Sequence, residues 1–468
     1  MERLTKRILA IVLIAVVGIG VGITVWIFVA PYTWSAKDCP GAPSNITEDQ
    51  IIRMGVLGGI YDIQGRGALE GSKLAAYEIN QAGGINVNGK TYYIGITAED
   101  TDESNPNLDT SKGVAAAERI INYKQVQFLT GGFRTESLSV YIETVMNAKI
   151  PFIDSGASTD SFCQNVLDNY NRYKYFFRDM PINSTSLGTE IITYILTMRA
   201  VLSSPLYANR SIYKFGLIYE ALDWTTPLVN AIKGVFADYS LPIVAEVAYP
   251  ITALQTDFDG YISDIQANGT QILIPVISAQ GGILLMNSYA GASPHPGFVV
   301  IGIDVQSQLD TFWSDSGEHC AYETVMQALY DTNKTPVSKP FWNAFEDMWG
   351  HDPLYTAVGS YDAIKMYAWA INETQSFNAN TIVSQLEEIR AYNPIFSPYP
   401  GLPGAGGYGA FTRSHDVREG YPFGYTLFVQ WHPDGTKVVV PSFGAIYPDA
   451  VATGSYLTPQ WDGWAFNT

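Results

Sequence analysis

Short apolar runs along this chain alternate with longer segments in which apolar residues recur every three or four positions. Residues 51–60 form a mainly apolar run with glycines near its end, and residues 68–84 have helical spacing that stops at a glycine pair. The first pattern predicts a buried strand and the second an amphipathic helix. Residues 91–100 predict the next strand. Strand, helix and strand at this spacing indicate a parallel sheet with helices on both faces.

The same alternation continues along most of the chain. It predicts further strands at 127–132, 150–156, 213–219, 242–248, 271–277 and 298–303. Helical patterns separate these strands, so the sequence predicts two similar α/β lobes, each built on a doubly wound sheet. Three more helical patterns follow at 340–350, 356–373 and 379–391, and a last strand is predicted at 425–431.

One short stretch matches the pattern of a nucleotide phosphate loop. Residues 84–91, GINVNGKT, fit G-x-x-x-x-G-K-T letter for letter. A phosphate loop needs a strand before it and a helix after it, whereas here the predicted helix comes first and the strand second. Asn88-Gly89 is instead typical of a tight turn that begins a strand. The stretch therefore does not predict a nucleotide site.

The N-terminal segment carries the longest apolar run. The run extends from Ile8 to Ala30 without a charged residue, and a membrane-spanning helix needs about 20 apolar residues. Arg3, Lys6 and Arg7 precede it, so the positive-inside rule places the bulk of the chain on the extracellular side. Residues 1–32 are thus predicted to be a membrane anchor and residues 33–50 a stalk. A cleaved signal peptide is the alternative.

Charge and motif content narrow the class of protein. The chain has 45 Asp and Glu against 27 Lys and Arg, a net charge of −18, which excludes nucleic acid as an expected partner. Neither CxxC nor HExxH occurs, and we expect no metal or other cofactor.

Two covalent modifications are suggested by an extracellular location. Of the three cysteines, Cys163 and Cys320 are the predicted disulfide pair, because Cys39 lies in the stalk. Candidate N-glycosylation sites are Asn45, Asn183, Asn209, Asn268, Asn333 and Asn372.

Ligands of doubly wound sheets bind at the loops that follow the strands. In this chain those loops are rich in glycine and hydroxyl residues, and they contain neither a nucleophile elbow nor an evident Ser/His/Asp set. The sequence therefore predicts a binding protein and not an enzyme.

Several segments resemble, in order, the type I solute-binding proteins of ABC importers, in particular the branched-chain amino acid binding branch. They include IRMGVLGG at 52–59, GSKLAAYEINQAGGINVNGK at 71–90, IPFIDSGAST at 150–159 and KFGLIYEALDWT at 214–225. The resemblance runs from about residue 51 to the end. It implies a protein that captures a small amino-acid-like solute between its lobes and delivers it to an ABC permease in the membrane.

The resemblance also implies a clamshell whose lobes are joined by three hinge crossings, near residues 178, 322 and 405. The first lobe is then expected to contain residues 51–178 and 323–405. The second is expected to contain residues 179–322 and 406–468.

Site residues are likewise implied by position within the resemblance. Hydroxyls of Thr135 and Ser158 are expected to bind the solute carboxylate, the Gly156 carbonyl and Asp304 its ammonium group, and Trp224 to cover it. Ser278, Gln280 and Tyr61 lie in the other contacting loops. Arg134 and Glu136 depart from the family pattern, because Arg134 stands where a serine is usual and a carboxylate at 136 would repel that of the solute.

Each of these residues has a purely structural alternative. Thr135 and Ser158 are also suited to cap the helices that begin there, and Asp304 to cap a turn. Trp224 is equally suited to the core, and Arg134 to an ion pair with Glu136.

A second functional hypothesis is a surface receptor, or a surface protein that assembles with copies of itself on the same fold. The chain contains 30 tyrosines and only 15% charged residues, which suits a surface that packs against itself.

Overall fold

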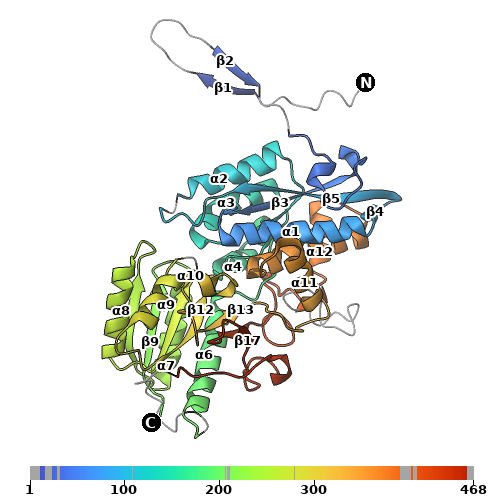
Figure 1. The fold of residues 1–468 in the computed structure, drawn as a ribbon. Helices are drawn as coiled ribbons and strands as arrows, with labels where there is room; N and C mark the ends of the chain where they lie inside the picture. Colours follow the sequence, from blue (N-terminus) through green and yellow to red (C-terminus); the bar gives the residue numbers. More distant parts are fainter. Residues whose placement is uncertain are drawn as a thin grey trace, which may run out of the picture.

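The computed structural model describes residues 11–15, 24–28, 32–107, 109–205, 207, 211–278, 280–389, 402–403 and 408–460. Figure 1 shows two α/β lobes, one above the other, with the N-terminal hairpin lying apart from both. The two predicted lobes are therefore confirmed.

The first lobe is built on a six-stranded sheet. Its strand order is β4 (Ile85–Val87), β5 (Lys90–Asp100), β3 (Ile51–Gly58), β6 (Phe128–Gly131), β7 (Phe152–Asp154) and β8 (Phe176–Arg178). All neighbouring strands run parallel except β4 and β5.

Helices cover both faces of this first sheet. On one face α1 (Ile63–Gln81) packs against α12 (Tyr355–Thr374), and on the other α2 (Ser111–Glu118) packs against α3 (Thr135–Ala148) (Figure 1). The lobe also contains α4 (Ser161–Asp168), α5 (Tyr170–Tyr173), α11 (Ser338–Trp349) and α13 (Ala379–Leu386). A Cβ on Gly71 of α1 would lie 2.0 Å from the Ala357 carbonyl oxygen, so α1 and α12 approach closely only because residue 71 is glycine.

The second lobe is built on a seven-stranded sheet. Its order is β10 (Ile243–Tyr249), β9 (Phe215–Glu220), β11 (Ile272–Ile277), β12 (Val299–Asp304), β13 (Thr324–Gln327), β16 (Leu427–Trp431) and β17 (Lys437–Val439). The strands from β10 to β13 are parallel, and β16 and β17 join antiparallel. Both sheets are thus mixed.

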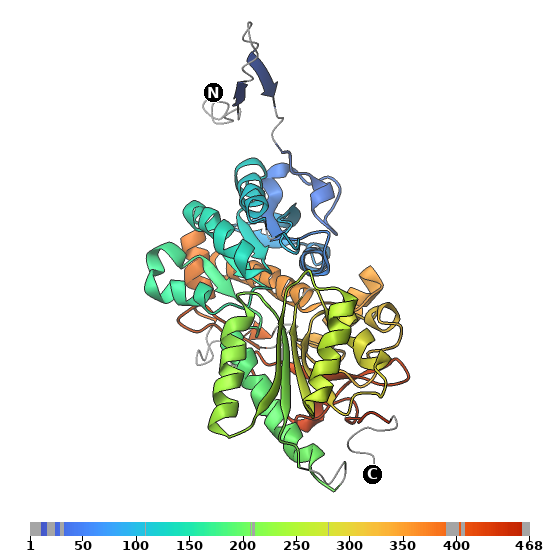
Figure 2. The ribbon, with the colours of Figure 1, turned by 90° about the vertical axis from the view of Figure 1, so that its left-hand side faces the viewer.

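Helices cover both faces of the second sheet as well (Figure 2). The pair α6 (Ser184–Leu202) and α7 (Thr225–Asp238) packs together, as does the pair α8 (Gln255–Ala267) and α9 (Gly282–Gly291). A short α10 (Phe312–Asp315) follows β12. A small hairpin of β14 (Leu402–Pro403) and β15 (Tyr408–Gly409) precedes β16.

The turn at the false phosphate motif is confirmed. Asn88 and Gly89 have φ values of 51° and 81° and connect β4 to β5. Two successive positive φ angles match the right-handed twist of a hairpin, and Asn-Gly is the dipeptide that adopts them most readily.

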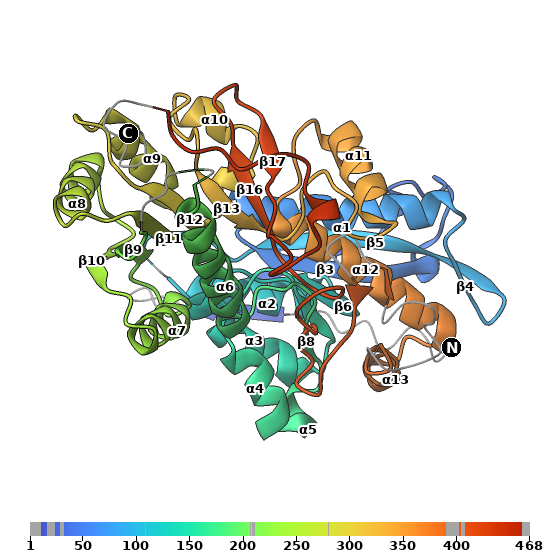
Figure 3. The ribbon, with the colours of Figure 1, turned by 90° about the horizontal axis from the view of Figure 1, so that it is seen from below.

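Segments far apart in sequence connect the lobes. β8 ends at Arg178 and leads into α6, and Figure 3 shows the C-terminal segment with β16 and β17 lying beside β13. The boundary expected at residue 322 precedes β13, which pairs with β12 and β16 in the second sheet. Residues 324–327 therefore lie with the second lobe.

The N-terminal region differs from its prediction. Residues 11–15 and 24–28, both inside the expected helix of residues 8–30, form the antiparallel strands β1 (Ile11–Ala15) and β2 (Thr24–Phe28). Their β-branched residues favour extended backbone. The rest of that segment lies outside the described residues, and no described helix is long and apolar enough to cross a membrane.

The expected stalk, residues 33–50, packs on the first lobe. Trp34 is buried, and its indole N–H donates to the Lys124 carbonyl at 2.7 Å. Asn80 of α1 donates to the Pro40 carbonyl at 2.8 Å. The segment therefore continues the folded lobe.

The predicted disulfide is not formed. Cys39, Cys163 and Cys320 are all free and buried. Cys163 belongs to the apolar core that includes the first lobe, whereas Cys320 belongs to a separate core in the second lobe, so the two thiols are held apart by the packing.

The candidate glycosylation sites differ in exposure. Asn45, Asn268, Asn333 and Asn372 are exposed, and Asn209 lies outside the described residues. Asn183 is the N-cap of α6, where its oxygen accepts from the N–H groups of Thr185 and Ser186 and its amide donates to Asp416. That side chain is already engaged in the fold.

Candidate functional site

The two sheets place their switch points opposite each other. β3 lies between β5 and β6 in the first sheet, and β9 lies between β10 and β11 in the second, so in each sheet the strands that follow lie on both sides of the first. Ligands of such sheets bind at the carboxyl ends of the strands beside this point. The loops after β6, β9 and β11 carry the predicted residues Arg134, Trp224, Ser278 and Gln280.

The lobes contact each other directly at these loops. Arg134 Nη2 donates to Gln280 Oε1 at 3.3 Å, and Gln280 Nε2 donates to the Ser104 carbonyl at 3.3 Å. Gln64 Nε2 donates to the Ser278 carbonyl at 3.1 Å. The Asp223 N–H donates to Glu136 Oε1 at 3.1 Å. The lobes are thus closed on one another.

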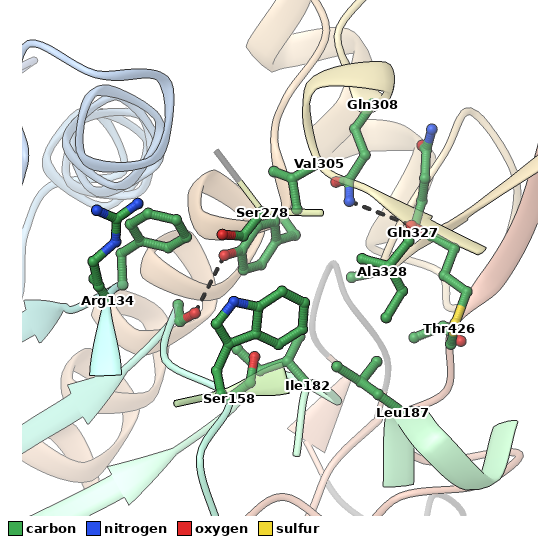
Figure 4. A pocket seen from close by; sticks show the side chains of 16 residues that line it. Arg134, Ser158, Ile182, Leu187, Ser278, Val305, Gln308, Gln327, Ala328 and Thr426 are labelled. Atoms are coloured by element: carbon green, nitrogen blue, oxygen red, sulfur yellow. Dashed lines mark hydrogen bonds between the residues drawn. The ribbon is translucent and has the colours of Figure 1, made fainter. Parts of the chain in front are cut away.

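A cavity of about 50 Å³ lies between the closed lobes (Figure 4). One water needs about 10–15 Å³ by this measure, so the cavity fits about four waters or a small solute. Its apolar wall consists of Phe133, Ile182, Leu187, Trp224, Ile303, Val305, Met326 and Ala328. Its other lining residues are Arg134, Gly156, Ser158, Ser278, Gln308, Gln327, Tyr355 and Thr426.

Arg134 supplies the positive charge of the cavity. It precedes α3 and is only 2% exposed. Its guanidinium donates to the Asn105 carbonyl at 3.5 Å and to Gln280, and its Nε–H has no acceptor among the described residues. The nearby Glu103 accepts the Arg134 backbone N–H at 3.2 Å, and burial raises the pKa of Glu103 to about 8.

Glu220 organises the wall contributed by the second lobe. It is fully buried at the end of β9. Its oxygens accept from the Ser278 hydroxyl at 2.6 Å, the Gln280 N–H at 3.2 Å and the Trp224 indole N–H at 3.4 Å. One carboxylate therefore fixes two cavity residues and the glutamine that crosses to the first lobe.

The carboxylate of Asp154 holds the loop that follows β7. Its Oδ1 accepts the N–H groups of Gly156 at 3.2 Å and Ala157 at 3.0 Å. Burial raises the pKa of Asp154 to about 7, although Arg178 and both N–H groups act in the opposite direction. A Cβ on Gly156 would lie 2.0 Å from the Gly132 carbonyl oxygen, so only glycine fits there.

Asp304 lies outside the cavity. It is fully buried at the end of β12, and its Oδ1 accepts the N–H groups of Gln306 at 3.0 Å and Ser307 at 3.4 Å. Its carboxylate also stands directly beneath Gly282 at the start of α9. Burial raises the pKa of Asp304, as it does that of neighbouring Glu323. These contacts are those of a residue that caps a turn, which was the structural alternative for Asp304.

The predicted site residues separate into three groups. Those that line the cavity are Arg134, Gly156, Ser158, Trp224 and Ser278, while Gln280 joins the lobes beside it. Thr135 is buried and shares a hydrogen bond with the Thr159 hydroxyl, and Tyr61 is 87% exposed. With Asp304, these two are not among the lining residues.

Sequence reasoning missed the lining residues near the crossings. Ile182 and Leu187 follow β8, Met326 and Gln327 end β13, and Ala328 comes directly after it. Their closeness to the crossings expected near 178 and 322 was the available signal, because crossing segments form the base of a cleft between lobes. Tyr355, at the start of α12, offered no comparable signal.

Two α/β lobes that close on a small cavity at their switch points define a binding protein of the type I periplasmic class. A family model described as periplasmic binding protein matches residues 52–416. The chain therefore belongs to the periplasmic binding protein family.

Solved structures of this class share the fold at low sequence identity. The branched-chain amino acid transporter substrate-binding protein LivJ of Streptococcus pneumoniae, solved with isoleucine, is 16% identical, with a TM-score of 0.64 over 83% of this chain and 97% of its own. A putative branched-chain amino acid ABC transporter protein from Silicibacter pomeroyi is 16% identical, with a TM-score of 0.68 over 88% and 99%. A Rhodopseudomonas palustris solute-binding protein, solved with p-hydroxybenzoic acid, is 14% identical, with a TM-score of 0.64 over 87% and 96%.

Proposed function

We propose that this chain captures a small, amino-acid-like carboxylate solute between its lobes and delivers it to an ABC permease. The observation that carries the proposal is the cavity itself, which joins the carboxyl ends of both sheets and has apolar walls and one buried guanidinium. Binding pockets for small molecules have this composition, in which a few polar groups orient the ligand and apolar walls exclude water.

The comparisons support this proposal. Related folds are solved with isoleucine, with leucine and with p-hydroxybenzoic acid, each of which bears a carboxylate on an apolar body. Arg134 is suited to bind that carboxylate, because a guanidinium presents paired N–H donors in the matching geometry. The apolar wall around Trp224 and Leu187 is suited to the rest of the solute.

Capture follows from the difference between open and closed lobes. A solute that contacts residues of both lobes binds the closed form more tightly than the open one and shifts the population toward closure. Gly156 and Tyr355 come from the first lobe, and Ser278 and Val305 come from the second. Closure also removes water, which strengthens the interaction with Arg134.

The proposed location is the outer face of a cell membrane. The uncharged apolar run from Ile8 to Ala30 and the basic residues before it support an N-terminal tether with the lobes outside. Treating membranes that contain the full chain with sodium carbonate tests this: retention in the pellet is expected, and release into the supernatant would contradict tethering.

A thermal-shift screen of the full chain tests the binding role. Amino acids, short peptides, amides, carboxylic acids and sugars are compared, and a solute that binds only the folded state raises its stability by about 2.7 kcal/mol at a hundredfold excess over Kd. A shift confined to one class of carboxylate supports the proposal. If no compound shifts a folded protein that assembles with itself in size-exclusion chromatography, the surface-assembly hypothesis replaces it.

A further inference from the structure

The charges around the cavity are unbalanced. Arg134 is the single charged side chain among the described lining residues, and no aspartate or glutamate lines the cavity there. An amino acid carries both a carboxylate and an ammonium group into such a site. The structure therefore raises the question of what the ammonium group would bind.

The guanidinium of Arg134 has acids nearby, Glu103 and Asp62, which interact with it electrostatically, but no close ion-pair partner in the part of the chain that the structure describes. It forms no ion pair with a carboxylate there, and its buried Nε–H lacks an acceptor. Burial raises the pKa of Glu103 to about 8, so this acid is largely neutral at pH 7. Because no acid is among the described lining residues and a buried guanidinium is stabilised by a close anion, this cavity favours an anionic solute.

The two positions expected to bind an ammonium group are already engaged. The Gly156 carbonyl accepts the hydroxyl of Tyr355 at 3.2 Å. Asp304 lies outside the cavity and accepts two backbone N–H groups. Asp304 is therefore not directed at a solute, and one of the two lone pairs of the Gly156 carbonyl is already used.

Glu220 is a further acid behind the cavity wall. It is fully buried, and both of its oxygens accept from donors, namely the Ser278 hydroxyl, the Trp224 indole and the Gln280 N–H. The side chains of Ser278 and Trp224 line the cavity in front of it. An ammonium group would have to displace these donors to reach the carboxylate.

We infer that the solute is a monocarboxylate without an ammonium group, such as a short branched or aromatic acid. The inference rests on the proposed function and names its solute class. Arg134 binds the carboxylate, the apolar wall surrounds the hydrocarbon, and an added ammonium group loses its hydration without gaining a partner. Discrimination of this kind is strong because it arises from an unpaired buried polar group.

Matched pairs of solutes test the inference on the full chain. Isothermal titration calorimetry at pH 7.5 compares 4-methylpentanoate with leucine, and 3-phenylpropanoate with phenylalanine, because each pair differs only by the ammonium group. We expect at least one acid to bind at least tenfold more tightly than its amino acid. The neutral 4-methylpentanamide serves as the control for charge and is expected to bind at least tenfold more weakly than the acid.

The outcomes separate the two proposals. If leucine or phenylalanine binds as tightly as the matching acid, the inference on solute class is wrong while the binding function stands. If neither acids nor amino acids nor the other classes of the thermal-shift screen bind, both proposals fall.

Variants of Arg134 add a second readout. Arg134→Met is expected to weaken the acid at least tenfold while leaving the amide within threefold, and Arg134→Lys is expected to restore part of the affinity because the charge returns. Equal loss for acid and amide in Arg134→Met would show a merely structural role and overturn the assignment of the carboxylate to Arg134.

Discussion

A buried ion pair at the first crossing between the lobes gives the sharpest test of how this fold is held together. Arg178, the last residue of β8, is fully buried. Its Nε donates to Asp416 Oδ1 at 2.8 Å and its Nη2 to Oδ2 at 2.5 Å. Its Nη1 donates to the carbonyls of Ala157 at 3.1 Å and Thr159 at 3.0 Å. The residue thus connects the crossing, the C-terminal segment and the loop that lines the cavity.

Replacing Arg178 with methionine removes the charge and all four hydrogen bonds while keeping an unbranched apolar side chain. Breaking a buried ion pair by removing one partner costs about 3–5 kcal/mol, because the other charge stays buried without compensation. The Asp416 side chain is only 11% exposed, so water compensates little of this. We therefore expect Arg178→Met to lower the free energy of unfolding by about 3–5 kcal/mol.

Urea unfolding followed by tryptophan fluorescence measures this change. The matched control is Lys233→Met, which breaks the 2.8 Å ion pair with Glu246, whose partners are 43% and 35% exposed. Exposed pairs contribute about 0–1 kcal/mol, so this variant is expected to unfold almost as the parent does. If Arg178→Met costs no more than Lys233→Met, the bidentate pair does not hold the crossing and the reasoning is refuted.

Three further predictions concern the cavity and its surroundings. Glu220→Gln places an amide donor against N–H and O–H donors. We therefore expect calorimetry to show that the best solute found in the screen binds at least tenfold more weakly, a loss of about 1.4 kcal/mol. Unchanged affinity would contradict the role of Glu220. Gln280→Ala removes two hydrogen bonds between the lobes, so small-angle X-ray scattering without solute is expected to show a larger radius of gyration. The control Gln255→Ala removes contacts to Leu284 and Ser288 that stay within the second lobe, and it is expected to leave the radius of gyration unchanged. Burial raises the pKa of Glu103 from 4.5 to about 8, so the contribution of Glu103 to stability is fully present below about pH 4.5 and is lost as the pH rises through 8. Glu103→Gln is therefore expected to flatten the fall of the unfolding temperature between pH 5 and 9. An unchanged pH profile would exclude Glu103 as the source of that fall.

The fold was largely predictable because its strands are short, apolar and separated by helices of clear period. Strands expected at 91–100, 271–277 and 298–303 appear as β5, β11 and β12 within a residue or two. β13, with sequence TVMQ, was not predicted because it has only four residues and half of them are polar. Its place between β12 and β16 depends on pairing with residues about a hundred positions later, which no local pattern records.

The candidate site was predictable only as far as the loops that follow the strands. Ser158 and Ser278 line the cavity, whereas Asp304 follows a strand equally closely and its carboxylate accepts backbone N–H groups of its own loop. The sequence tells where a strand ends but not which way the next side chain points, because the backbone conformation of the loop decides that. Tyr355 lies about two hundred residues from the Gly156 carbonyl that accepts its hydroxyl, a pairing that only the folded chain defines.

The contacts between the closed lobes explain why residues 134 and 136 differ from the family pattern. A carboxylate at 136 was expected to repel an anionic solute, but Glu136 accepts the Asp223 N–H of the opposite lobe instead, and Arg134 reaches across to Gln280. Both residues therefore hold the lobes together, and Arg134 also faces the cavity. Because Gln280 is fixed by the same carboxylate of Glu220 that fixes Ser278 and Trp224, a solute that orders this wall also orders the contacts between the lobes. Binding and closure are then coupled through shared residues, because Arg134 lines the cavity and also reaches Gln280 of the opposite lobe.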